Sequence, residues 1–188
     1  MPRPKKVKRK TTSHIIDGIT YTSANLVTVH KELKANKYIK SFTLPTTKKH
    51  GKFNSKKAIV NNIEFDSIME ARYYAYLLLR VADKTDSLIS FERQIKYNLL
   101  PKGRNKFTGK AIRETSYIAD FVLTHSNNKA TEVIDVKGQK TPDFKLKEKM
   151  FMLKYPDLDF KCVQYDSVTH DWYELDTLNK IKKQRKTK

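Results

Sequence analysis

The chain has one cysteine, Cys162, and no hydrophobic run long enough to cross a membrane. A single cysteine excludes an internal disulfide and a cysteine-based zinc site, so a reducing cytoplasm is the simplest expected setting. A membrane-spanning helix needs about 18 consecutive apolar residues, and the chain contains no apolar run of that length. The N-terminus also lacks the apolar core of a signal peptide. These absences favour a protein that works inside the cell without a membrane.

Acidic residues are nearly missing from the two ends of the chain. Residues 1–57 hold 15 basic and 2 acidic residues, and residues 180–188 hold 6 basic residues and no acidic one. The segment 58–179 holds 18 of each, so the formal net charge of +19 comes from the flanks. A neutral module with cationic ends is typical of proteins that bind a phosphate backbone. A nuclear-localisation signal in PRPKKVKRK is the alternative for the first residues.

The charge pattern and the turn signals predict four segments. Residues 1–13 have the composition of a disordered basic arm. A small N-terminal extension follows and ends in a basic linker over 46–57. The predicted division is therefore 1–13 arm, 14–57 extension and linker, 58–179 core, and 180–188 basic tail, which we expect to close on a short helix.

The predicted fold class is α/β of the α+β type. In the extension we expect a strand and turn from residue 14, a helix over 23–36 and a strand over 39–44. In the core we expect the order α-β-β-β-α-β after a first short strand. The predicted core elements are a strand at 58–65, a helix to about Val81, strands at 88–100, 115–124 and 130–137, a helix at 142–154 and a strand at 159–166.

A weak internal repeat links the extension to the core. Residues 18–23 resemble residues 62–67 at an offset of 44, and each stretch precedes a helix-like run. At that offset Leu26 falls where the second copy has Glu70. The extension is either a shortened duplicate that lost its acid or a chance similarity.

Residues 131–138, TEVIDVKG, carry the most specific chemical pattern. Side chains two apart on a strand point the same way and lie about 6.6 Å apart, so Asp135 and Lys137 would share a face. Glu132 would face the other side. If the strand SYIADFVL pairs alongside, Asp120 approaches Asp135 and forms an oxygen-lined site of the kind that Mg²⁺ prefers. An exposed edge-strand ion pair is the alternative.

The same acid–lysine spacing occurs at Glu32–Lys34 and Asp143–Lys145. We reject the second pair because Thr141-Pro142-Asp143 has the pattern of a helix start. The first pair lies in a helix-like polar run. Along the helix 142–154, we expect the apolar side to enter the core; its members are Leu146, Met150 and Leu153.

Four motifs in this order resemble those of the PD-(D/E)xK nuclease superfamily. The runs FNSKKAIVNNIEFDSIMEARYYAYL, ERQIKYNLLP, SYIADFV and EVIDVKG resemble a phage-encoded branch catalogued as a domain of unknown function, over about residues 52–166. The resemblance implies a restriction-endonuclease-like αβββαβ core, in which helices flank a mixed sheet. It places Asp120 and Asp135 as motif acids and Lys137 as the motif lysine, while Ala119 stands where the name-giving proline would be.

The same resemblance implies a metal site and adds Glu70 as the helix acid. The implied Mg²⁺ ligands are Asp120, Asp135, the backbone carbonyl of Val136 and Glu70, with Mn²⁺ as an expected substitute. Glu70 also fits an S-x-x-E capping box with Ser67, which is the alternative role.

Further residues are candidates for contacts with DNA. The segment 101–116 is strongly basic and is expected to be a mobile hairpin loop near the substrate. Gln94 is a candidate for orienting a phosphate or a water molecule, with a plain surface role as the alternative. The DNA-binding candidates are Lys102, Arg104, Lys106, Lys110 and Arg113 in that segment, and Lys145 and Lys149 at i and i+4 on the helix 142–154.

The function implied is that of a Mg²⁺-dependent DNA endonuclease of a phage or mobile element. Branched recombination or replication intermediates are the expected substrates, the host cytoplasm the expected location, and a homodimer the expected assembly for symmetric cleavage. The alternative is a non-catalytic nucleic-acid-binding protein of phage DNA metabolism. No residue excludes RNA as the substrate.

Overall fold

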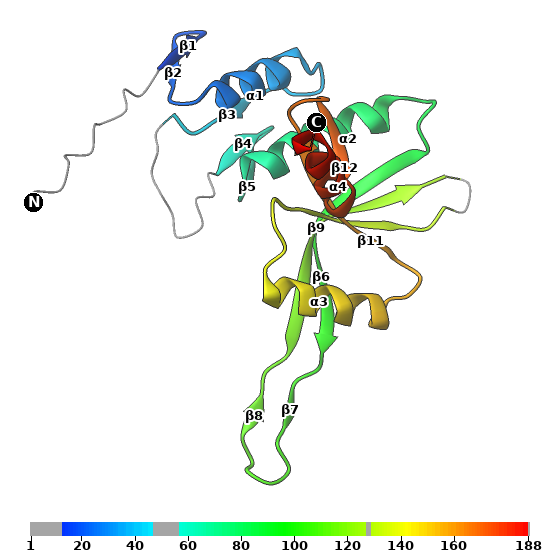
Figure 1. The fold of residues 1–188 in the computed structure, drawn as a ribbon. Helices are drawn as coiled ribbons and strands as arrows, with labels where there is room; N and C mark the ends of the chain where they lie inside the picture. The colour runs from blue at the N-terminus through cyan, green and yellow to red at the C-terminus, as the bar shows by residue number, and fades with distance from the viewer. Residues whose placement is uncertain (1–12, 47–56, 127–128, 188) are drawn as a thin grey trace, which may run out of the picture. The chain divides into compact units, whose positions relative to one another are not determined.

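The computed structural model describes residues 13–46, 57–126 and 129–187 (Figure 1). The described residues fall into two units, one ending at Tyr76 and the other beginning at Leu77. The predicted basic arm and basic linker lie almost entirely outside the described residues. The predicted boundaries after residues 13, 57 and 179 stay predictions.

The first unit contains the same local structure twice. Strands β1 (His14–Ile16) and β2 (Ile19–Tyr21) form a hairpin that leads into α1 (Ala24–Ala35). Strands β4 (Ala58–Val60) and β5 (Ile63–Phe65) form a second hairpin that leads into α2 (Ile68–Ala82). Strand bounds and pairing register coincide at an offset of 44, with His14 opposite Tyr21 and Ala58 opposite Phe65. The repeat seen in the sequence is therefore a repeat of structure.

Both hairpins turn through two residues in the left-handed conformation. The φ angles are 50° and 75° at Asp17 and Gly18, and 51° and 63° at Asn61 and Asn62. Two-residue hairpin turns with positive φ at both positions match the twist of the flanking strands, and Gly, Asn and Asp tolerate that conformation best. The prediction of one strand over residues 58–65 is wrong, because Asn61 and Asn62 reverse the chain there.

The helix and strand that follow the first hairpin differ in how well they were predicted. Helix α1 begins after Ser23 and confirms the predicted helix over 23–36. Leu26 on α1 is 2% exposed, so the position equivalent to Glu70 serves packing. The expected strand over 39–44 is reduced to β3 (Phe42–Thr43), which pairs with β4.

The second unit is built on one mixed sheet of five strands in the order β12-β11-β10-β9-β6. Strands β10 and β11 are parallel, whereas the other neighbours are antiparallel. The bounds are Leu88–Leu100 for β6, Thr115–His125 for β9, Glu132–Val136 for β10, Asp159–Asp166 for β11 and Asp171–Glu174 for β12. The α+β class and the α-β-β-β-α-β order are confirmed; β12 was not predicted.

Helix α3 (Pro142–Lys154) packs on this sheet through two phenylalanines seven residues apart. Phe144 and Phe151 are buried among Tyr117, Val133 and Phe160. The prediction that Leu146 and Leu153 enter the core is wrong, because they are 60% and 86% exposed. Residues seven apart lie on the same side of a helix, and the larger aromatic rings occupy that side. Met150 is partly buried against the same cluster.

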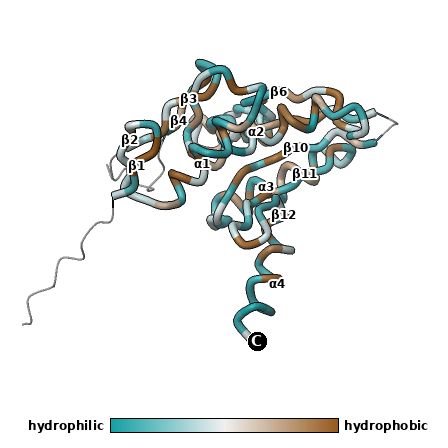
Figure 2. The backbone as a smooth tube through the Cα atoms, turned by 90° about the horizontal axis from the view of Figure 1, so that it is seen from above, coloured by the Kyte–Doolittle hydropathy of each residue, from teal (hydrophilic) through white to brown (hydrophobic). Residues whose placement is uncertain are grey.

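The C-terminal helix α4 (Leu175–Lys186) confirms the predicted short helix. Leu175 and Leu178 are buried, while the rest of the helix is mostly hydrophilic (Figure 2). Arg185 Nη1 donates to Oδ2 of the buried Asp166 at 2.8 Å. Arg185 therefore ties the last turn of α4 to β11 of the sheet.

The orientation of α3 generates a stability prediction. Phe151→Ala should lower the free energy of unfolding by about 3–5 kcal/mol, because the fully buried ring contacts Tyr97, Tyr117 and Phe160. Leu153→Ala, two residues along, should change it by less than about 0.5 kcal/mol. Urea unfolding followed by circular dichroism measures both. Equal losses in the two variants would contradict this helix orientation.

Candidate active site

Asp120 and Asp135 lie opposite each other where the β9–β10 ladder ends. The paired residues run from Glu132 opposite Leu123 to Ile134 opposite Phe121, and one more step along this register brings Asp120 level with Asp135. There the backbone N–H of Val136 donates to Asp120 Oδ2 at 2.8 Å. A side-chain carboxylate thus replaces the next ladder bond. Because directly opposed residues point to the same face, the two carboxylates are neighbours.

Asp135 is only 3% exposed, so its charge needs partners. Tyr117 Oη donates to Asp135 Oδ1 at 3.0 Å, and Lys137 Nζ donates to Oδ2 at 2.7 Å. Burial raises the pKa of Tyr117 far above its usual value, and the charges of Asp135 and Asp120 raise it further. Tyr117 therefore stays a hydrogen-bond donor over the working pH range.

Lys137 sits between a carboxylate and an aromatic ring. Its Nζ lies 4.2 Å from the centre of the Phe144 ring, in the geometry of a cation–π contact. Ring and carboxylate together hold the ammonium beside the two aspartates. The structure thus brings together Asp120, Asp135 and Lys137, as predicted from the strand pattern.

These side chains line one solvent-open pocket between the sheet and the start of α3. Its lining residues are Ser116, Tyr117, Ile118, Asp120, Asp135, Lys137, Thr141, Asp143, Phe144 and Lys147. Thr141 Oγ1 accepts from the Phe144 N–H at 3.3 Å, which confirms the predicted helix start. Asp143, rejected as a motif acid, therefore stands on the pocket rim in the first turn of α3, 3.4 Å from Lys147.

Glu132 lies away from this pocket, as predicted. It is 6% exposed and pairs with Lys129 at 2.8 Å and Lys161 at 3.0 Å. Burial alone raises its pKa, but the hydrogen bonds from both lysines lower that pKa to about 2. Glu132 therefore stabilises the sheet through its ion pairs with Lys129 and Lys161.

Glu70 makes the contact of a helix cap. Its backbone N–H donates to Ser67 Oγ at 3.1 Å, and that hydroxyl lies 2.8 Å from Glu70 Oε1. This geometry matches the capping role considered for Ser67 and Glu70. Glu70 belongs to the first unit, so its approach to the aspartates of the second unit stays a prediction.

Gln94 has an unusual backbone for the middle of a strand. Its φ is 55°, while its neighbours pair regularly, Arg93 with Phe121 and Ile95 with Ala119. The same register places Gln94 across from Asp120. A left-handed residue other than glycine costs about 1–3 kcal/mol, and such strain gathers at functional sites. Its role in orienting a phosphate or a water molecule stays a prediction. The register shows that Gln94 lies next to Asp120.

The oxygen groups of the pocket fit the requirements of Mg²⁺ in part. Within residues 13–46, 57–126 and 129–187, no three His, Cys, Asp or Glu side chains come together in the manner of a metal cage. Mg²⁺ usually takes one or two carboxylates and keeps water or substrate phosphate as its other ligands. Asp120 and Asp135 at an open pocket meet that requirement. The Val136 carbonyl and Glu70 stay predicted ligands.

Cys162 stands opposite Asp135 on the other side of β10. Burial raises the pKa of its thiol to about 12, and the Asp135 charge adds to the effect. A protonated, buried thiol is not a nucleophile. The pocket's chemistry therefore rests on oxygen and nitrogen groups.

The basic segment 101–116 is a hairpin extension with its own strands. Strands β7 (Gly103–Arg104) and β8 (Ala111–Ile112) pair beyond the ends of β6 and β9, where a mobile hairpin loop had been expected. Every residue from 101 to 114 is exposed, which includes all five predicted phosphate contacts there. Lys145 and Lys149 are exposed on α3, and Lys145 lines a neighbouring hollow with Lys140 and Asn179.

The sequence-based prediction missed Tyr117, Phe144 and Lys147. The signal for Tyr117 was present, since a tyrosine hydroxyl in an apolar strand needs a buried partner. Phe144 was missed because the prediction turned the side of α3 that carries Leu146 and Leu153 toward the core. Lys147 reaches the pocket only because the helix begins at Pro142.

Fold and site define an α+β protein with two facing strand carboxylates and a lysine two residues beyond one of them. The chain belongs to the family described as Protein of unknown function (DUF1064), whose model matches residues 50–168. No curated protein and no solved structure matches the chain. Among the described residues, no helix is both long and apolar enough to cross a membrane.

The buried ion pairs of Glu132 generate a pH prediction. Because the folded pKa of about 2 lies below the ordinary 4.5, Glu132 stabilises the fold above pH 4.5. That contribution should disappear as the pH falls from about 4.5 through about 2. Urea unfolding at steps across this window should show a smaller acid loss for Glu132→Gln than for wild type. Glu92→Gln, which removes an exposed carboxylate of β6, is the control and should follow wild type. Parallel pH profiles for Glu132→Gln and wild type would contradict the assignment.

Proposed function

We propose that this protein is a Mg²⁺-dependent DNA endonuclease that hydrolyses phosphodiester bonds. The observation that carries the proposal is the meeting of Asp120, Asp135 and Lys137 at one open pocket. Two adjacent carboxylates can hold a divalent cation next to a phosphate, and a lysine beside them can counter the charge that develops there. A bound Mg²⁺ supplies polarisation of the phosphoryl oxygen and a lowered pKa for water.

Each residue of the pocket has a distinct task in this proposal. Asp120 and Asp135 bind the cation, and Tyr117 fixes the orientation of Asp135 through its 3.0 Å hydrogen bond. Lys137, held 2.7 Å from Asp135, orients the attacking water or donates to the phosphate oxygens. Gln94 is proposed to orient a phosphate or water from the neighbouring strand. The proposal includes Mn²⁺ as a substitute metal.

The resemblance to the PD-(D/E)xK superfamily supports the same activity. Its motif positions coincide with the residues that the sheet register brings together, and the α-β-β-β-α-β order agrees with that fold. From the resemblance we further propose a phage or mobile-element origin, branched recombination or replication intermediates as substrates, a homodimer and the host cytoplasm.

A second candidate function is non-catalytic nucleic-acid binding. The observation that favours it is the exposed basic hairpin, which would contact phosphates whether or not the pocket cuts. In that case Asp120 would serve only to terminate the β9–β10 ladder, and Asp135 would serve only to bind Tyr117 and Lys137.

The two functions differ in what the aspartates do. Asp120→Asn and Asp135→Asn should each lower Mg²⁺-dependent cleavage by at least about a hundredfold, because several kcal/mol of transition-state stabilisation is removed. DNA affinity should remain within about threefold, since the hairpin cations are unchanged. Cleavage of linear, forked and four-way DNA measures the first effect, and fluorescence anisotropy measures the second.

The matched control is Asp171→Asn, which removes an exposed carboxylate from β12 of the same sheet and should cut like wild type. Circular dichroism verifies that all three variants fold. A wild-type protein that binds all the substrates and cuts none of them in Mg²⁺ or Mn²⁺ would overturn the enzyme proposal and favour the second candidate.

The flanking charges generate a prediction about salt. Deletion of residues 1–13, or Lys→Gln at the exposed Lys180, Lys183 and Lys186 of α4, should weaken DNA binding. For every lysine or arginine that no longer neutralises a phosphate, the slope of log affinity against log salt should fall by about 0.9. The substitutions leave Arg185 on Asp166, whereas deletion of residues 180–188 would remove the arginine that pairs with this buried carboxylate. Unchanged slopes in both variants would contradict a role for the flanks in binding.

A further inference from the structure

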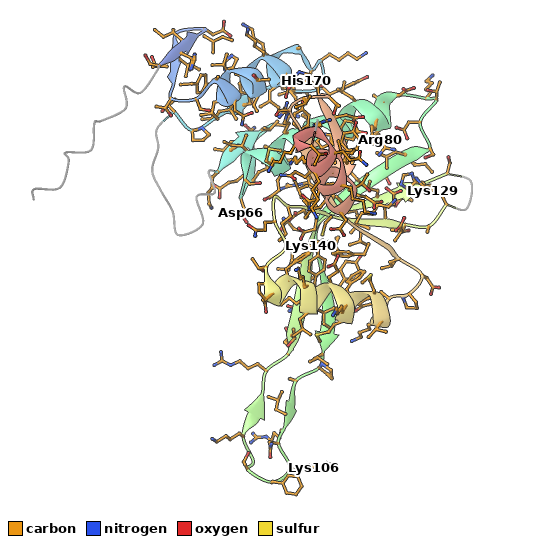
Figure 3. The ribbon with its side chains drawn as sticks, viewed as in Figure 1. Asp66, Arg80, Lys106, Lys129, Lys140 and His170 are labelled. Atoms are coloured by element: carbon orange, nitrogen blue, oxygen red, sulfur yellow. The ribbon has the colours of Figure 1, made fainter. Side chains whose placement is uncertain are left out.

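The β7–β8 hairpin carries a large apolar side chain where it is least expected. Phe107 is 98% exposed, the highest value among the exposed large hydrophobic residues of the described chain. It follows Lys106 in the chain, and Lys106 is labelled at the end of the hairpin that runs out from the five-stranded sheet beyond α3 (Figure 1 and Figure 3). No described residue of the second unit covers it.

The tip that presents Phe107 is a hydrogen-bonded turn. Asn105 Oδ1 accepts from the N–H groups of Phe107 at 3.0 Å and Thr108 at 2.9 Å. The Gly109 N–H donates to the Asn105 carbonyl at 2.9 Å, and the Asn105 N–H donates to the Lys110 carbonyl at 2.9 Å. Gly109 adopts a φ of 66°, which the closing turn requires. The backbone that carries the ring is thus already ordered, so little backbone entropy is lost when the ring binds a partner.

The charges around the ring indicate the partner. The hairpin carries five basic residues, Lys102, Arg104, Lys106, Lys110 and Arg113. Its one acid, Glu114, is paired with Lys96 at 2.5 Å, and that lysine lowers the pKa of its carboxyl. A positive, protruding ribbon with an apolar tip suits a polyanion that also has flat apolar faces. Nucleic acid has both, whereas a protein groove for one phenylalanine would not need this surround of cations.

We infer that Phe107 is a wedge that stacks on a nucleobase where the DNA stack is open, while the hairpin cations hold the phosphates on either side. Apolar side chains enter DNA between base steps at a cost of a few kcal/mol for unstacking, and that cost falls where bases are already unpaired. A fork, a junction or a frayed end offers such a place, and continuous duplex does not. Phe107 therefore selects branched DNA. This inference rests on the DNA-directed function proposed above and adds the group that recognises the branch.

The length of the hairpin limits the distance between the base that Phe107 contacts and the phosphate at the candidate site. Thirteen positions separate Phe107 from Asp120. At roughly 3.3 Å per residue the strand path covers at most about 40 Å. At roughly 3.4 Å per base pair this corresponds to about 12 base pairs of DNA. The open bases contacted by Phe107 therefore lie within about one helical turn of the phosphate that is cut.

The test measures DNA binding without cleavage. Wild type, Phe107→Ala and Phe107→Trp are compared by fluorescence anisotropy in EDTA, with a forked DNA and a continuous duplex of the same length and base composition. Phe107→Ala should weaken binding to the fork by about tenfold or more, as removal of one stacking interaction predicts, and leave the duplex affinity unchanged. Phe107→Trp should keep the preference for the fork.

A control variant and a second measurement distinguish stacking by Phe107 from an unspecific effect of changing the hairpin. Ile112→Ala, on the same hairpin and 51% exposed, is the matched control and should bind both DNAs like wild type. A 2-aminopurine placed at the branch should change its fluorescence on binding wild type and not on binding Phe107→Ala, as stacking on that base requires.

Each outcome decides the matter. Equal affinity of wild type and Phe107→Ala for the fork, or an equal loss on fork and duplex, overturns the wedge while the nuclease proposal stands. Loss of cleavage in Asp135→Asn together with loss of fork preference in Phe107→Ala supports both proposals. A wild-type protein that binds neither DNA in EDTA overturns the wedge, while cleavage in Mg²⁺ decides the nuclease proposal separately.

Discussion

The register between β9 and β10 is the constraint on which the candidate site depends. Because side chains alternate along a strand, a slip of one residue would turn Asp120 to the opposite face and separate it from Asp135. The Val136 N–H to Asp120 Oδ2 bond holds that register where the backbone ladder has ended. Tyr117 and Lys137 then act on Asp135, so the contacts among these four side chains follow from one strand alignment.

The fold separates the two features on which the proposed nuclease function rests. The carboxylates lie on central strands of a sheet, supported by the aromatic cluster around Phe151, where their positions are held rigidly. The basic residues proposed to contact DNA lie on the β7–β8 hairpin and on the exposed faces of α3 and α4. Hairpin and site are nevertheless connected through β9, which carries Asp120 and continues outward together with β6 as the hairpin (Figure 1). A force on the hairpin therefore reaches Asp120 through one continuous backbone.

The sequence predicted well those features that depend on periodicity. Alternation in SYIAD and TEVIDVKG was enough to place Asp120, Asp135 and Lys137 together, and Thr141-Pro142 marked the start of α3. The sequence did not predict features that depend on one unusual backbone conformation, or on which of two apolar helix sides packs against the sheet. Asn61 and Asn62 have no glycine to announce a turn, and Leu146 and Leu153 compete on equal hydrophobicity with Phe144 and Phe151. The left-handed backbone conformation of Gln94 and the exposure of Phe107 depend on the surrounding structure. Short sequence motifs do not predict either feature.

The burial of Cys162 has a practical consequence for the study of this protein. It is the single cysteine of the chain, it is buried, and its thiol pKa is raised to about 12. Maleimide reagents require an accessible thiolate, so they should leave the native protein unlabelled. A cysteine introduced at any exposed position then becomes a unique attachment point for a dye or a spin label. The natural sequence is in effect a ready background for single-molecule distance measurements.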